Sequence, residues 1–98
     1  MRAIELELYQ TFLNQNGHLS IVHKIEETYL HVMNYNGSLY QIRKDGNTQY
    51  GISTIDAQWF FENYPEDRIN FDQKQYFCSI KEKFEKTQQK SKKLLLIL

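Results

Sequence analysis

Apolar residues over positions 2–16 recur with the spacing of one helix face. Ile4, Leu8 and Phe12 stand four residues apart, and Gly17 follows where helices commonly end in the left-handed conformation. The same stretch opens with apolar residues at alternate positions, so a short strand is the rival interpretation. We prefer an N-terminal helix, because the apolar residues after position 8 extend only the helical pattern.

From residue 18 the apolar pattern changes to a period of two, which is typical of half-buried strands. Runs of this kind cover residues 18–25, 28–35, 38–43 and 48–53. Asn36-Gly37 and Asp45-Gly46 separate the later runs, and both pairs favour two-residue hairpin turns because they tolerate positive φ. The pattern predicts a four-stranded antiparallel meander.

Two helical patterns follow the strands. Ser53 or Thr54 is placed to cap the first helix, and Pro65 marks its end. The second helix starts near Asp72, and its apolar stripe holds Tyr76, Phe77, Ile80 and Phe84. We therefore expect an α+β fold with an N-terminal helix, a four-stranded antiparallel meander and two C-terminal helices. A single domain covers residues 1–93, and an apolar tail covers residues 94–98.

Two-residue turns determine which side chains share a face of the sheet. They pair Met33 with Tyr40 and Leu39 with Ile52, and a turn at Glu26-Glu27 pairs Ile21 with Val32. The face predicted to form the core holds Leu19, Ile21, Ile25, Leu30, Val32, Leu39, Tyr50 and Ile52.

The opposite face of the predicted sheet carries Tyr29, Tyr35 and Tyr40 beside histidines and lysines. If these rings are exposed together, they form a platform that contacts a partner or stacks the bases of a single-stranded nucleic acid. The alternative is that a helix covers part of this face and leaves the tyrosines at its edge. Both interpretations stay open at this point.

Composition narrows the class of protein. The 98 residues carry twelve Lys and Arg against twelve Asp and Glu, so no overall charge favours nucleic acid. A single cysteine excludes an internal disulfide and suits the cytoplasm, and we expect neither a signal peptide nor a transmembrane segment. Phe, Tyr, Met, Ile, Asn and Lys number 40, against 10 for Gly, Ala, Arg and Pro, which favours a low-GC bacterium, its plasmid or its phage.

The histidines and the cysteine of this chain do not have the spacing that a metal site or a catalytic site requires. His18 and His31 share a predicted face but lie on the order of 13 Å apart, and His23 points to the other face. Cys78 has no neighbouring base in the sequence, and we expect it to be a small buried residue. We predict no enzyme, no catalytic residue, no cofactor and no metal site.

Charge is distributed unevenly along the chain. Residues 81–98 hold six Lys and two Glu, a net charge of +4, whereas residues 51–80 carry −3. Either these lysines form the solvated face of an amphipathic helix, or they contact phosphates, an anionic membrane or an acidic partner. The candidate phosphate contacts are Lys81, Lys83, Lys86, Lys90, Lys92 and Lys93.

The end of the sequence is wholly apolar over residues 94–98. Five exposed aliphatic side chains would form an apolar surface that favours association. We therefore expect them to fold back onto the domain or to be buried against a second chain. A homodimer through this segment is one expectation, with Leu94, Leu96 and Leu98 as contacts.

The leading functional hypothesis is a small non-catalytic intracellular protein that binds and regulates another protein and comes from a phage, plasmid or other mobile element. Its predicted contacts are Tyr29, Tyr35 and Tyr40 together with Leu94, Leu96 and Leu98. The alternative is a nucleic-acid-binding accessory protein that uses the lysine-rich helix and the tyrosine-bearing sheet face.

Overall fold

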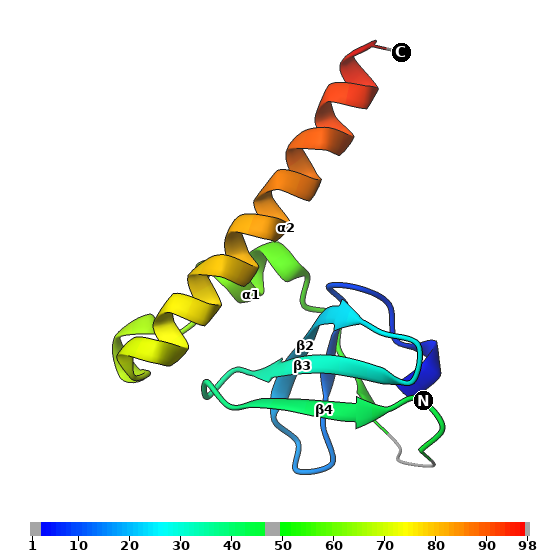
Figure 1. Cartoon of the computed structure of the whole chain (residues 1–98), viewed down its shortest axis with the longest axis vertical. Helices are drawn as coiled ribbons and strands as arrows, with labels where there is room; N and C mark the ends of the chain where they lie inside the picture. Colours follow the sequence, from blue (N-terminus) through cyan, green and yellow to red (C-terminus); the bar gives the residue numbers. More distant parts are fainter. Residues whose placement is uncertain (1–2, 47–49, 98) are drawn as a thin grey trace. The chain divides into compact units, whose positions relative to one another are not determined.

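The computed structural model divides the chain into two compact units, Met1–Arg68 and Ile69–Leu98. It describes residues 3–46 and 50–97, with the side chains up to residue 88. The first unit holds an antiparallel sheet and the short helix α1, and the second holds the long helix α2 (Figure 1). The predicted α+β class and the two C-terminal helices are confirmed. Within the part of the chain that is described, no helix is long and apolar enough to cross a membrane.

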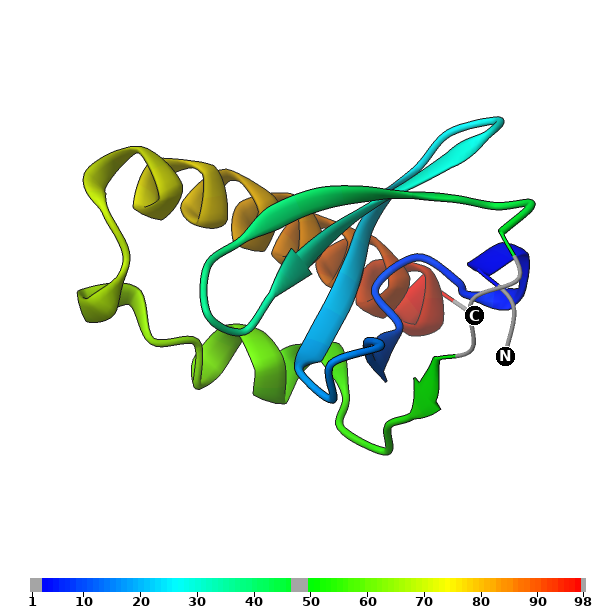
Figure 2. The same ribbon diagram turned by 90° about the horizontal axis from the view of Figure 1, so that it is seen from below.

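The sheet has five antiparallel strands in the order β4-β3-β2-β1-β5. Their bounds are β1 Thr11–Leu13, β2 Leu19–Ile25, β3 Tyr29–Asn34, β4 Leu39–Arg43 and β5 Gly51–Ile52. The predicted meander is present as β2-β3-β4, and Figure 2 shows its strong twist. The predicted hairpin at Asp45-Gly46 is wrong: β5 pairs with β1, where Phe12 faces Ile52 and Leu13 faces Gly51.

The predicted N-terminal helix is also wrong. The chain forms a short 3-10 helix, η1 (Ala3–Glu5), and then enters β1. Phe12 is fully buried and faces Ser20 of β2, so the apolar spacing reflects packing against the sheet. A helix of this length is marginal without tertiary contacts, whereas β1 joins two strands of the sheet.

Two turns of the same construction join β1 to β2 and β3 to β4. Each begins with Asn-x-Asn-Gly, at residues 14–17 and 34–37, and Gly17 and Gly37 adopt φ of 78° and 97°. The glycine N–H donates to the first asparagine's carbonyl at 2.9 and 3.0 Å. The first asparagine's N–H donates to the carbonyl four residues later, at 2.9 and 2.8 Å. These are three-residue loops with a left-handed glycine. The second is one residue longer than the predicted Asn36-Gly37 turn, and the first stands where a helix was predicted to end.

The longer loop changes the register of β4. Val32 faces Tyr40 and Met33 faces Leu39, so the predicted pair of Met33 with Tyr40 is wrong. The predicted turn at Glu26-Glu27 and the predicted pair of Ile21 with Val32 are also wrong. The Glu26 N–H donates to the Tyr29 carbonyl at 2.8 Å, so the turn lies at residues 27–28, and a further irregularity between Val22 and Lys24 leaves Ile21 facing Met33. Because one residue of slip reverses every side chain, the predicted core face mixes residues of both faces. Ile52, which was placed in that core, is 77% exposed.

Both faces of the sheet carry buried side chains. One core cluster holds Ala3, Leu6, Phe12, Val22, Leu30, Val32, Ile42 and Tyr50, with Tyr40 packed against it. Ile21 and Met33 face each other on the other side of the sheet and are also buried. The sheet therefore has no open face on which the three predicted tyrosines could lie together.

Side chains other than the predicted ones begin the two helices. Asp56, and neither Ser53 nor Thr54, caps α1 (Ala57–Glu62), because its carboxylate accepts the Trp59 N–H at 2.7 Å. A second 3-10 helix, η2 (Glu66–Arg68), precedes the second unit.

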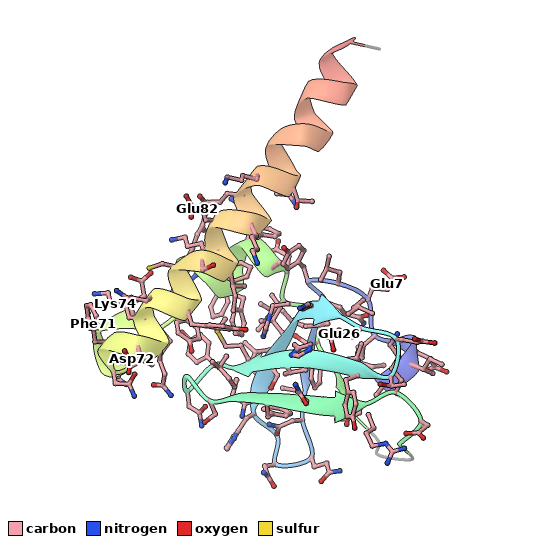
Figure 3. All side chains as sticks on the ribbon, in the orientation of Figure 1. Glu7, Glu26, Phe71, Asp72, Lys74 and Glu82 are labelled. Atoms are coloured by element: carbon pink, nitrogen blue, oxygen red, sulfur yellow. The ribbon has the colours of Figure 1, made fainter. Side chains whose placement is uncertain are left out.

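Helix α2 spans Phe71–Ile97, and Figure 3 labels Phe71, Asp72 and Lys74 near its start. Asn70 and Gln73 cap it reciprocally, at 2.8 and 3.4 Å. Of the predicted stripe, Phe77, Ile80 and Phe84 are buried, and Tyr76 is largely exposed. Cys78 is exposed, so its predicted burial is wrong.

Candidate binding cleft

The three predicted contact tyrosines lie in different surroundings. Tyr29 begins β3 opposite Arg43 and is partly exposed. Tyr40 shares a face with Val32 and packs against the core. Tyr35 belongs to the turn between β3 and β4. They form no common platform, so the expectation that rested on a shared face is wrong, and their individual roles in binding stay predictions.

Tyr35 joins the β3–β4 turn to the α1 segment. Its N–H donates to the Leu19 carbonyl at 2.8 Å, and its hydroxyl donates to the Asn63 carbonyl just after α1. Three aromatic rings of that segment surround its ring: Trp59, Phe60 and Tyr64, with centroids 6.2, 5.7 and 5.9 Å away. The ring is stacked on Trp59 and meets the other two edge-on, and these contacts hold it rigidly.

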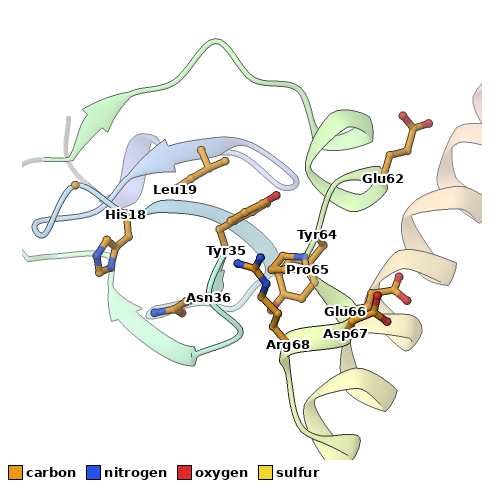
Figure 4. A pocket seen from close by; sticks show the side chains of 11 residues that line it. His18, Leu19, Tyr35, Asn36, Glu62, Tyr64, Pro65, Glu66, Asp67 and Arg68 are labelled. Carbon is orange, nitrogen blue, oxygen red and sulfur yellow. The ribbon is translucent and has the colours of Figure 1, made fainter.

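An open cleft of about 950 Å³ lies beside this aromatic cluster (Figure 4). It is bounded by the β1–β2 turn, the β3–β4 turn and residues 62–68, all within the first unit. Its apolar and aromatic lining comes from Leu19, Tyr35, Tyr64 and Pro65, and its polar groups include His18, Asn36 and Arg68. The cleft thus combines a fixed aromatic surface with hydrogen-bonding groups at its rim.

The charges around the cleft are arranged asymmetrically. Arg68 is exposed, forms no ion pair within the described residues, and reaches toward Tyr35 in Figure 4. Glu62, Glu66 and Asp67 also line the cleft, but their carboxylates point away from His18 in the same view. The guanidinium is therefore the charged group best placed to meet a ligand.

Tyr64 contributes a neutral phenol to the cleft. Burial raises the pKa of Tyr64 to about 12, because a phenolate would be poorly solvated there. The hydroxyl consequently stays protonated near neutral pH. The side chain adds aromatic surface and no charge.

The predicted lysine and leucine contacts belong to α2. Lys83 and Lys86 are exposed and Lys81 is half-buried, with Glu82 and Glu85 between them in the sequence. The side chains of Lys90, Lys92, Lys93, Leu94 and Leu96, and the whole of Leu98, lie outside the described residues. Their proposed roles stay predictions.

The histidines are not arranged as the sequence indicated. The His23 and His31 rings lie 6.1 Å apart on the paired strands β2 and β3, where the register is irregular between Val22 and Lys24. Glu26 lies between Lys24 Nζ at 3.2 Å and His31 Nε2 at 3.3 Å. Across the described residues, no group of three or more His, Cys, Asp or Glu side chains could hold a metal ion.

The cleft itself escaped prediction from the sequence. The repeated Asn-x-Asn-Gly motif, twenty residues apart, is a signal that two equivalent turns are present. No spacing along the chain indicates that Tyr35 contacts residues 59–64. That contact depends on the tertiary fold.

No protein-family model, no curated protein and no solved structure matches this chain. The function must therefore be argued from the geometry of the site.

Proposed function

We propose that the protein is a non-catalytic binding protein whose cleft holds a short segment of another protein. The observation that carries this proposal is the aromatic lining around Tyr35, beside an Arg68 guanidinium that forms no ion pair with any described residue. Regulation of the partner would follow from occupying the surface that this segment otherwise presents to other molecules.

The residue types in the cleft favour a protein ligand. Tyrosine, tryptophan and arginine are the commonest energetic anchors of protein interfaces. Tyr35 is already immobilised by its hydroxyl and by the surrounding rings, so binding would cost little further side-chain entropy. Trp59, stacked on Tyr35 and 44% exposed, extends the same surface beyond the cleft.

The charge at the rim specifies the partner further. The Arg68 guanidinium forms no ion pair within the described residues, although Glu66 and Asp67 also line the cleft. It can bind a carboxylate of the partner through two parallel hydrogen bonds. The neighbouring Leu19, Tyr35 and Pro65 favour an apolar or aromatic side chain. We expect the bound segment to place an acidic residue next to an apolar one.

The codon composition supports an origin in a low-GC bacterium or its mobile elements, and the single cysteine supports a cytoplasmic location. A homodimer through residues 94–98 is a separate proposal. Sedimentation of the full chain beside a chain ending at Lys93 tests it, because loss of a dimer on truncation supports the contact. Two monomeric proteins would contradict it.

Selection from a phage-displayed library of short random peptides, with the full-length protein as bait, tests the proposed function. Enriched peptides should combine acidic with apolar or aromatic residues. The Arg68→Gln substitution should weaken their binding by about tenfold to a hundredfold, the range expected for hydrogen bonds to a charged group.

Lys74→Gln is the matched control, because it removes the same charge from an exposed lysine of α2 and should leave binding unchanged. No enrichment of peptides with an acidic residue beside an apolar one, or equal binding of such peptides by the Arg68→Gln protein, would contradict the proposal. So would tight binding of random single-stranded DNA that weakens steeply between about 50 and 200 mM salt, which would favour the nucleic-acid function.

A further inference from the structure

Among the described residues, the outer edge of β4 presents backbone groups that have no hydrogen-bond partner. β4 is the outermost strand of the sheet and lies beside β3. Two backbone hydrogen bonds flank the residues that the two strands pair: the Asn34 N–H donates to the Ser38 carbonyl at 2.8 Å, and the Lys44 N–H donates to the Thr28 carbonyl at 3.0 Å. In an antiparallel pair, hydrogen-bonded positions alternate with positions whose groups point outward. Tyr40 and Ile42 therefore bond to β3, whereas Leu39, Gln41 and Arg43 direct their N–H and C=O groups outward.

Most of these outward groups have no partner in the described structure. The Arg43 carbonyl accepts the Gly46 N–H at 3.2 Å, but both groups of Leu39 and Gln41 and the Arg43 N–H bond to no described residue. The strand contains no proline and no lysine, and the Arg43 side chain bonds to Asp45 at 3.1 and 3.0 Å. The one charged side chain of this five-residue strand is thus paired locally, and no proline interrupts the edge, so a further strand can pair along it.

A groove of about 550 Å³ runs beside the same edge. Its lining includes Tyr40, Ile42 and Tyr50, with the amides Asn14 and Asn34 at one end. A strand added to β4 would place every second side chain over this groove. The Arg43 charge is neutralised by Asp45, and no acidic residue lines the groove, so we expect uncharged side chains at those positions.

We infer that β4 binds an extended segment of a partner protein as an additional antiparallel strand. Main-chain hydrogen bonds to Leu39 and Gln41 would supply affinity, and the groove beside Tyr40 and Ile42 would select the alternate side chains.

A second copy of this chain fits the edge less well. Two β4 strands paired about Gln41 join only five residues each, well short of the roughly 1,200–2,000 Å² that stable interfaces bury. The groove-side residues of a second β4, Tyr40 and Ile42, are already packed in that copy's own core. They cannot also fill the groove, whereas a free segment can.

Gln41→Pro tests this inference. Proline removes the outward N–H without removing a bond to β3, and proline is tolerated at edge positions of this kind. Gln41→Val is the matched control, because it keeps the N–H and favours a strand. Peptides selected on the full-length protein from a displayed random library serve as the probe.

Edge-binding peptides should lose at least about tenfold in affinity on Gln41→Pro and bind normally to Gln41→Val and Arg68→Gln. Hydrogen exchange at the Leu39 and Gln41 amides should slow when they bind. If Gln41→Pro unfolds the protein, N-methylation of alternate peptide amides replaces it and should abolish binding. The absence of any peptide with this behaviour would overturn the inference, as would a dimer in sedimentation that Gln41→Pro dissociates. Failure of the cleft proposal is a separate result: peptides with an acidic residue beside an apolar one would then bind the Arg68→Gln protein as tightly as the unchanged protein.

Discussion

The side-chain amide of Asn14 donates a hydrogen bond to the side-chain carbonyl of Asn34 at 3.2 Å and joins the two Asn-x-Asn-Gly turns. The same Asn34 oxygen accepts a hydrogen bond from the fully buried Ser20 hydroxyl. Asn14 also accepts the N–H groups of Asn16 and His18 through its own oxygen, at 2.9 Å each. The two turns that border both candidate binding surfaces are therefore held by one polar network.

This network should contribute measurably to stability. Asn34→Ala removes the acceptor shared by the Ser20 hydroxyl and the Asn14 side-chain amide. Losing these two hydrogen bonds, each worth about 0.5–1.5 kcal/mol, should cost about 1–3 kcal/mol of unfolding free energy. Gln15→Ala, an exposed change in the turn beside it, should stay within about 0.5 kcal/mol of the unchanged protein. Urea denaturation measures both. Equal midpoints for the two variants would show that the network is dispensable.

The left-handed glycine of the first turn should matter through its backbone alone. A Cβ at Gly17 would meet no atom within 4 Å, but its φ of 78° is unfavourable for other residues. Gly17→Ala should therefore destabilise the protein by about 1–2 kcal/mol, and Gly17→Asn by less, because asparagine tolerates this conformation. Thermal unfolding of the two variants tests this order. A neutral Gly17→Ala variant would argue against the turn as described.

Tyr35 should be important for stability as well as binding. Tyr35→Phe removes the hydroxyl bond to the Asn63 carbonyl but keeps the ring contacts, so we expect a loss of about 0.5–1.5 kcal/mol. Tyr35→Ala also removes the stack on Trp59 and should cost more. Trp59 is the single tryptophan, so its fluorescence reports the change directly. An unchanged emission spectrum in Tyr35→Ala would contradict the stacked arrangement.

Low pH should reduce the free energy of unfolding, and Glu26 should account for part of this loss. His31, followed by Lys24, lowers the pKa of Glu26 below 4.5. Because the folded-state pKa is the lower one, this contribution is complete above about pH 4.5 and disappears as the pH falls through the folded value. Glu26→Gln should therefore be less stable than the unchanged protein at about pH 6, and the difference should shrink toward about pH 3.

Unfolding free energies at several pH values check this dependence. Glu27→Gln removes the same charge from a neighbour with no ion pair in the described structure, and it serves as the control. If the unfolding free energies of Glu26→Gln and the unchanged protein differ by the same amount at every pH in this range, the explanation is wrong.

Local patterns predicted the elements better than their arrangement. The period-two runs located β2, β3 and β4, and the aromatic spacing located both helices. The predicted β3–β4 register was wrong because the loop at residues 35–37 is one residue longer than a two-residue turn. The predicted β2–β3 register was wrong because the turn lies at residues 27–28 and the pairing is irregular near His23.

Long-range pairing was the harder part. Residues 51–52 pair with β1, about forty positions earlier, and the Ile4, Leu8 and Phe12 spacing carries no trace of that partner. The cleft depends on the contact of Tyr35 with Trp59 and Asn63, which the sequence places far apart. Nothing local to either segment indicates it.

Backbone chemical-shift mapping of the isotope-labelled protein tests the central proposal most directly, with the tightest selected peptide that carries an acidic residue beside an apolar one. We expect the largest shifts at Leu19, Tyr35, Asn36 and Arg68, which line the cleft, and the Arg68→Gln protein should lose them. Shifts confined to the lysines of α2, or unchanged binding by the Arg68→Gln protein, would contradict the account.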